Sequence, residues 1–152
     1  MRILLAEDDL FFQNFYSRKL TEAGFQVEVA GDGNEALQKI MVIKPDLMLL
    51  DLIMPNKDGF EVLTEISKHQ SLKSIPVIIF STLGQTADIE KAKRLGATDY
   101  VNKTFFDFEN LLTAWGLYQE TEGYKDLVKN PVEGFADFKN DMDKIKIRYY
   151  EK

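Results

Sequence analysis

Two kinds of apolar spacing alternate along this chain of 152 residues, and the alternation limits the fold more than any other feature. Short, nearly continuous apolar runs are typical of strands buried on both faces, and apolar residues three and four positions apart are typical of helices. Strands are expected at Arg2–Ala6, Phe25–Ala30, Asp46–Asp51, Pro76–Ser81 and Thr98–Asn102. Helices are expected at Leu10–Ala23, Asn34–Ile43, Phe60–His69, Thr86–Leu95 and Asp107–Tyr118. Five strand–helix repeats with right-handed crossovers predict an α/β, doubly wound sandwich around a parallel sheet.

Composition narrows the class of protein and its surroundings. The chain is 45% hydrophobic and 29% charged, ordinary values for one globular domain with an appendage. No apolar run approaches the roughly 20 residues of a membrane span, and MRILLAEDD becomes acidic too early for a signal peptide. The lack of cysteine excludes disulfides and thiolate metal sites and fits the cytoplasm, the location we expect. A net charge of -6 argues against direct binding to nucleic acid or an anionic membrane.

Polar side chains gather where the expected strands end, at the edge where doubly wound sheets bind their ligands. They are Glu7, Asp8 and Asp9 after the first strand, Asp51 at the end of the third, Ser81 after the fourth and Lys103 after the fifth. Crowded carboxylates are unfavourable unless a cation joins them, and oxygen ligands without His or Cys favour Mg²⁺ or Mn²⁺ over zinc. An Asp beside such an ion can attack phosphorus, and a lysine and a hydroxyl can bind phosphate. The sequence therefore predicts a metal-assisted phosphoryl site.

These residues resemble the receiver domain of bacterial two-component response regulators. Asp8-Asp9 follows the first strand, and DLIMPNKDG, which begins at Asp51, fits the family's D-x-x-M-P-x-x-D-G loop. Ser81 ends the fourth strand, and DYVNK contains Tyr100 and Lys103. The resemblance covers residues 1–118, the expected receiver domain. It implies a chemotaxis-regulator-like, flavodoxin-like (βα)₅ fold with strand order 2-1-3-4-5.

The resemblance also implies a metal site with assigned ligands. Asp51 would be the phosphoacceptor. Asp9 and Asp51 would ligate Mg²⁺ directly together with the backbone carbonyl of Ile53, and Asp8 would act largely through water. Glu7 receives no ligating role.

A conformational switch and two partners follow from the same resemblance. Lys103 would pair with the phosphoryl group, Ser81 would move toward it, and Tyr100 would turn inward. The protein is then a signalling phosphoacceptor and not an enzyme, although it assists its own phosphorylation and dephosphorylation. Its partners would be a histidine kinase and a downstream protein bound through the face of the fourth helix, fifth strand and fifth helix.

Two parts of the expected site depart from the family's pattern, the loop at Lys103-Thr104 and the pair Ile53 and Leu83. Lys103-Thr104 stands where the family usually has Lys-Pro with a cis bond. A cis bond costs about 3–4 kcal/mol before a non-proline residue, so we expect a trans bond and a reshaped loop. Ile53 and Leu83 flank the expected path of attacking water, and neither can orient a water molecule. We therefore expect slow self-dephosphorylation.

Residues 119–152 form an expected C-terminal helical extension and not an independent domain. Asn130-Pro131-Val132-Glu133 is typical of a helix start. One apolar stripe follows at Phe135, Phe138, Met142, Ile145 and Tyr149. We expect the stripe to dock on its own domain, and a homodimer or partner contact through residues 132–150 is the alternative.

Two other functions compete with the receiver interpretation. An aspartyl-phosphate phosphatase of the haloacid dehalogenase type would need D-x-D at the nucleophile, and Asp51-Leu52-Ile53 lacks the second acid. A phosphorylation-independent interaction module is compatible with the altered loop at Lys103-Thr104.

Overall fold

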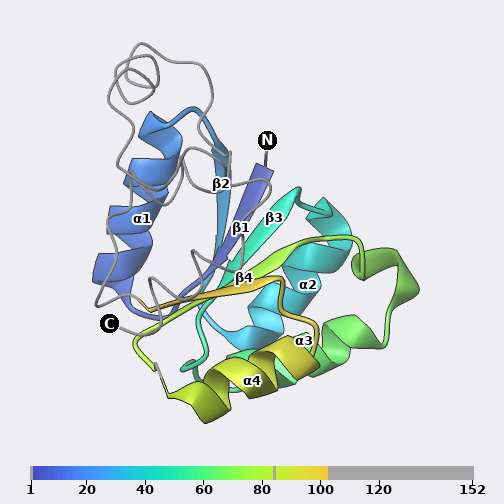
Figure 1. The fold of residues 1–152 in the computed structure, drawn as a ribbon. Coiled ribbons are helices and arrows are strands. Elements are labelled where there is room, and N and C mark those ends of the chain that lie inside the picture. Colours follow the sequence, from blue (N-terminus) through green and yellow to red (C-terminus); the bar gives the residue numbers. More distant parts are fainter. Residues whose placement is uncertain (1, 84, 103–152) are drawn as a thin grey trace, which may run out of the picture.

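A five-stranded parallel sheet lies between helices in the computed structural model, which describes residues 2–83 and 85–102 (Figure 1). The strands are β1 (Arg2–Ala6), β2 (Gln26–Ala30), β3 (Leu47–Leu50), β4 (Val77–Ser81) and β5 (Asp99–Asn102). The helices are α1 (Leu10–Glu22), α2 (Gly33–Ile43), α3 (Gly59–Ser67) and α4 (Thr86–Arg94), with a short 3₁₀ turn, η1 (Gln70–Leu72). The strand order is β2-β1-β3-β4-β5, which confirms the predicted doubly wound arrangement. The expected fifth helix at Asp107–Tyr118 and the extension 119–152 lie outside the described residues.

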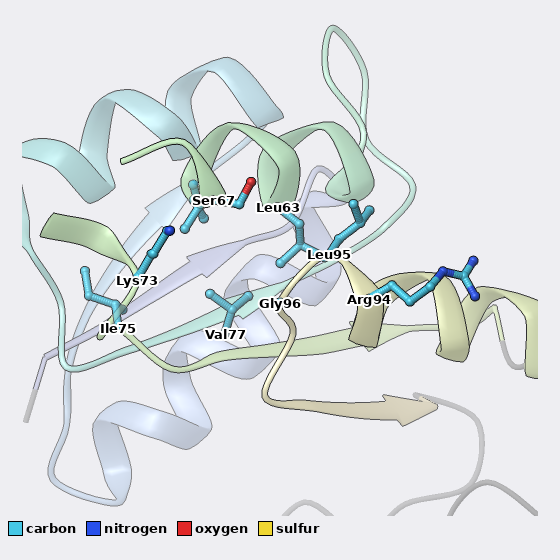
Figure 2. A pocket seen from close by; sticks show the side chains of 9 residues that line it. Leu63, Ser67, Lys73, Ile75, Val77, Arg94, Leu95 and Gly96 are labelled. Carbon is cyan, nitrogen blue, oxygen red and sulfur yellow. The ribbon is translucent and has the colours of Figure 1, made fainter. Parts of the chain in front are cut away.

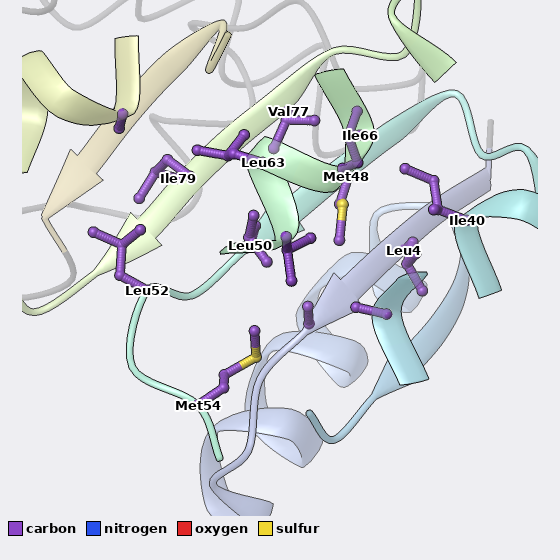
Figure 3. Packing of buried hydrophobic residues seen from close by; sticks show 14 of the residues in the cluster. Leu4, Ile40, Met48, Leu50, Leu52, Met54, Leu63, Ile66, Val77 and Ile79 are labelled. Atoms are coloured by element: carbon purple, nitrogen blue, oxygen red, sulfur yellow. The ribbon is translucent and has the colours of Figure 1, made fainter. Parts of the chain in front are cut away.

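Both faces of the sheet are apolar, as the continuous runs in the sequence predicted. Alternate side chains of a strand point to opposite faces, so each strand contributes to two cores. Leu4, Met48 and Ile79 belong to the core shared with α2, α3 and α4, and Figure 3 shows these side chains among those of the helices. Leu5 and Phe80 belong to the other core, which α1 covers with Tyr16 and Leu20. Helix α1 thus lies on one face of the sheet, and helices α2 to α4 lie on the other.

Aspartates begin the first three helices. The side chains of Asp9, Asp32 and Asp58 accept hydrogen bonds from backbone N–H groups in the first turns of α1, α2 and α3. Such caps satisfy N–H groups that have no partner inside a helix. They fix the points at which the chain leaves the carboxyl edge of the sheet, where the predicted site lies.

The lengths and hydropathy of the helices can be compared with those of a membrane span. Within residues 2–83 and 85–102, no helix is both long enough and apolar enough to cross a bilayer.

Candidate functional site

The register of the central strands places two acids side by side. Ala6 at the end of β1 pairs with Leu50 at the end of β3, so Glu7 and Asp51 are the next residues on neighbouring strands. The Asp51 N–H donates to the carbonyl of Ala6 at 3.0 Å, and the Glu7 N–H donates to that of Ala30 at 3.0 Å. Main-chain hydrogen bonds therefore hold both residues at the carboxyl edge.

Three carboxylates meet at this point. Oxygen atoms of Glu7, Asp8 and Asp51 lie within 4.8 Å of one another. Glu7 is only 1% exposed and Asp51 8% exposed, whereas Asp8 is exposed. Like charges in a buried place repel strongly, and a cation among them removes that cost. Oxygen donors without nitrogen or sulfur fit a hard divalent ion such as Mg²⁺.

The negative charge of the carboxylate cluster affects the pKa of a neighbouring phenol, Tyr16. Burial, together with the charges of Glu7 and Asp51, raises the pKa of Tyr16 to about 12. Tyr16 comes from α1 and packs its ring edge-on against Phe80 of β4, with ring centroids 4.7 Å apart. The cluster therefore acts electrostatically on the core beneath it.

Asp9, which the sequence predicts to be a metal ligand, begins the first helix. Its Oδ1 accepts hydrogen bonds from the N–H groups of Phe11 at 2.9 Å and Phe12 at 3.2 Å, which makes it the N-cap of α1. Among the described residues, the group of three carboxylates contains Glu7 and not Asp9. Asp8 and Asp51 are brought together as expected. The first turn of α1 engages the Asp9 Oδ1, and the assignment of Asp9 as a metal ligand stays a prediction.

Gln13 is a residue that sequence reasoning missed. Its Nε2 donates to the backbone carbonyl of Glu7, and the Glu7 Oε1 accepts the N–H of Asp9 at 3.1 Å. One turn of α1 separates Gln13 from the cap, and its own N–H donates to the carbonyl of Asp9 at 2.9 Å. In the sequence, the contact of Gln13 with the Glu7 carbonyl is indicated only by the place of Gln13 four residues after the helix cap.

The loop after Asp51 is held against the sheet by close packing. The Ile53 N–H donates to the Asp51 Oδ1 at 3.3 Å, which keeps the main chain of Ile53 beside the carboxylate. The Gly59 N–H donates to the carbonyl of Leu52 at 2.9 Å. A Cβ on Gly59 would lie 2.4 Å from the Asp51 carbonyl oxygen, so the approach requires glycine.

Ser81 and Tyr100 converge on Leu83. Ser81 is fully buried, and its Oγ accepts the N–H of Leu83 at 3.2 Å. Tyr100 is also fully buried, and its hydroxyl donates to the carbonyl of Leu83. Burial raises the pKa of the Tyr100 phenol, and the charge of Asp88 adds to the effect. The tyrosine thus lies inward, bonded to the segment that leads into α4.

Comparison with known proteins decides the family. Residues 3–115 match the family model described as the response regulator receiver domain. The chain belongs to this receiver family. It is 42% identical over 105 residues to "Response regulator RR06" of Streptococcus pneumoniae, a match that covers 69% of this chain and 47% of that protein. The receiver therefore spans about half the length of that relative.

Solved receiver structures share the fold. The Francisella response regulator 1452 receiver domain superposes with a TM-score of 0.69 and 34% identity, covering 77% of this chain and 95% of that one. The Vibrio cholerae chemotaxis protein CheY4 gives a TM-score of 0.70 and 29% identity, covering 78% and 98%. The predicted resemblance to two-component, chemotaxis-regulator-like receivers is confirmed.

One predicted residue of the receiver site cannot be placed. Lys103 and the Lys103–Thr104 bond lie outside the described residues, directly after β5. The expected trans bond and the reach of Lys103 stay predictions. Within the described part, the candidate site consists of the carboxylate cluster, the Asp51 loop, and Ser81 and Tyr100 with Leu83.

Proposed function

We propose that this receiver accepts a phosphoryl group from a histidine kinase on Asp51, in a Mg²⁺-dependent reaction, and signals through a conformational switch. The observation that carries the proposal is the meeting of three carboxylates within 4.8 Å, with Asp51 buried at their inner side. No other role accounts as well for buried like charges at the ligand-binding edge of a doubly wound sheet.

The metal would be held by Asp8 and Asp51 with the backbone carbonyl of Ile53. Glu7, in place of Asp9, would complete the acidic set directly or through water, because the Asp9 carboxylate already caps α1. Mn²⁺ would fit the same oxygen donors. When bound, the ion supplies positive charge opposite the phosphoryl oxygens.

Phosphoryl transfer needs little more from the chain than a positioned nucleophile. An Asp51 carboxylate oxygen attacks the phosphorus of a phosphohistidine, the O–P bond forms as the N–P bond breaks, and the histidine nitrogen keeps the electron pair. Lys103 would pair with the transferred group. The protein thereby assists its own modification and belongs to a family of signalling regulators.

The switch would run through Leu83. The Ser81 hydroxyl accepts a hydrogen bond from the Leu83 N–H. On phosphorylation it would turn toward the phosphoryl oxygens and give up this bond. Tyr100 holds the carbonyl of the same residue, so a displacement of this segment reaches both α4 and β5. A downstream protein would then bind the face of α4, β5 and the expected fifth helix. Ile53 and Leu83 provide no group to orient water, which supports a long-lived phosphorylated state.

Intact mass spectrometry tests the proposal directly. The full chain is incubated with acetyl phosphate and Mg²⁺, and a gain of one phosphoryl group is expected. Asp51→Asn is the matched variant and should show no gain, and chelation of the metal should prevent the gain in the unaltered chain. An unaltered chain that gains no mass, or an equal gain in Asp51→Asn, would contradict the proposal.

One observation favours a second function, a phosphorylation-independent interaction module. Lys103-Thr104 stands where the receiver family usually has Lys-Pro, which alters the loop that would bind the phosphoryl group. A target that binds the unmodified chain and the phosphorylated chain equally well would favour this second function.

A further inference from the structure

A hollow of about 310 Å³ opens between the end of α3, the start of β4 and the end of α4 (Figure 2). It lies at the amino edge of the sheet, because Val77 begins β4 whereas Ser81 ends the strand at the carboxylate edge. Four residues of extended strand span about 13 Å. The hollow is therefore separate from the receiver's phosphoryl site.

The deeper wall of the hollow is mostly apolar. Ile66 and Val77 are buried beneath it, and Ile75 and Leu95 are half-buried at its sides. These residues come from α3, from the segments before and within β4, and from the end of α4. An apolar surface assembled from three elements gains free energy when it is covered.

The rim is positively charged. Lys73 and Arg94 lie on opposite sides of the hollow (Figure 2), and both are exposed. Neither makes an ion pair with another described residue. None of the nine lining residues in the described part of the chain is acidic. The rim is therefore basic in a chain whose net charge is -6.

We propose that this hollow docks a segment of a partner protein that presents one bulky apolar side chain flanked by carboxylates. The apolar side chain would fill the hollow, and the carboxylates would pair with Lys73 and Arg94. An apolar anchor in a pocket with arginine at the rim is the common pattern of protein interfaces.

The placement of charge favours a protein segment over a small ligand. Small-molecule sites orient their ligand with polar groups set among the apolar lining. Here the cations are exposed at the rim, and the Ser67 hydroxyl already donates to the carbonyl of Thr64. The side chains of Ile66, Ile75, Val77 and Leu95 offer no hydrogen bond. A peptide needs no such group, because its main chain stays outside while one side chain enters.

The site is independent of phosphorylation chemistry, since it shares no residue with the carboxylate cluster. Asp51→Asn should therefore bind the partner segment as the unaltered chain does. This variant separates failure of the docking site from failure of the proposed phosphoacceptor function.

The experiment is an NMR titration of the ¹⁵N-labelled full chain with a capped pentapeptide in which two glutamates stand on each side of one phenylalanine. We expect the amide resonances of Ile75, Val77, Leu95 and Gly96 to shift in a saturable way. Two control peptides replace the phenylalanine with alanine or the four glutamates with lysines, and both should bind at least tenfold more weakly.

Variants of the chain complete the test. Lys73→Glu combined with Arg94→Glu should weaken the glutamate peptide about tenfold or more, since two ion pairs become repulsions. Arg18→Glu combined with Lys19→Glu changes the net charge by the same amount, but on α1, which lies on the other face of the sheet. This control should alter binding less than twofold. Ser67→Phe keeps the charge and should block the hollow. No shift in the unaltered chain, shifts centred elsewhere, or equal binding by the lysine peptide would overturn the proposal.

Discussion

The two edges of the sheet handle charge in opposite ways. At the carboxyl edge Glu7 and Asp51 are buried with Asp8 beside them, and the surrounding backbone is tightly packed. Around the hollow at the amino edge, the buried lining residues are apolar, and the cations Lys73 and Arg94 stand exposed at its rim. A bound cation would relieve the repulsion between buried like charges, which is the basis of the proposed metal site. Exposed charge around an apolar hollow needs no ion and indicates a contact surface.

The largest effect on stability is expected from replacing a glycine at each edge, which tests how tightly the two edges are packed. Gly59→Ala at the carboxyl edge should lower the free energy of unfolding by about 3 kcal/mol, because its Cβ would meet the Asp51 carbonyl oxygen. Gly96→Ala at the amino edge has open space around its Cβ and should cost about 1 kcal/mol through its φ of +103°. Urea denaturation measures both.

Asparagine at the same two positions provides the control. Asn tolerates a positive φ, so Gly96→Asn should recover most of the loss, whereas Gly59→Asn should not. Equal losses in Gly59→Ala and Gly96→Ala, with no recovery by Gly96→Asn, would remove the contrast between the edges.

The buried charge of the carboxyl edge should also appear in the pH dependence of stability. The pKa of Tyr16 is raised to about 12 by burial and by Glu7 and Asp51, so the folded state keeps a proton that the unfolded state loses near pH 10. The contribution of Tyr16 is complete below pH 10 and is lost as the pH rises toward 12. Between pH 9 and 11.5 the free energy of unfolding of the unaltered chain should fall by about 2 kcal/mol more than that of Tyr16→Phe. Chemical denaturation at the two pH values measures the loss of stability in each protein. Equal losses in the unaltered chain and in Tyr16→Phe would contradict the prediction.

Glu7 and Asp9 can be separated by a matched pair of amide substitutions. Glu7→Gln keeps an acceptor for the Asp9 N–H but removes one charge from the cluster. It should raise the free energy of unfolding without Mg²⁺ by about 1 kcal/mol and weaken Mg²⁺ binding about tenfold. Asp9→Asn retains the N-cap and should change either quantity little. Calorimetry with Mg²⁺ and thermal unfolding give the two readouts, and a larger loss of Mg²⁺ affinity in Asp9→Asn would restore the assignment made from sequence.

The smallest effect is expected at the amino edge. Arg94→Gln removes an exposed charge with no ion pair to a described residue and should shift stability by less than about 0.5 kcal/mol. Its Mg²⁺ affinity, measured in the same calorimeter, should equal that of the unaltered chain. A measurable loss of Mg²⁺ affinity would show that the two edges are coupled.

Local patterns were sufficient to predict the parallel sheet, and the resemblance to receiver domains supplied its strand order. The strand at Arg2–Ala6 and the helix after it follow from apolar spacing, and the ends of the strands then bring Asp8 and Asp51 together. The roles of Glu7 and Asp9 could not be separated in the same way. Three consecutive acids look alike in sequence, and only the pairing of Ala6 with Leu50 and the first turn of α1 distinguish a cluster member from a helix cap.

Contacts made across a turn or between distant segments account for what sequence reasoning missed. Gln13 reaches the Glu7 carbonyl only because α1 turns back over the end of β1. The hollow joins the ends of α3 and α4 with the start of β4, and no periodicity within one segment reports such a meeting. Ser81 and Tyr100 were predicted as a switch pair, yet their common contact, Leu83, was assigned only to the path of water.

The main-chain bonds that hold Glu7 and Asp51 have a consequence for protein engineering. Each residue is positioned by its own N–H on a neighbouring strand, so the spacing of the two Cα atoms does not depend on which side chains they bear. The carboxyl edge is in this sense a fixed template with replaceable donors. Exchanging carboxylates for imidazoles at these positions would change the preferred metal toward zinc or copper while the sheet stays as it is.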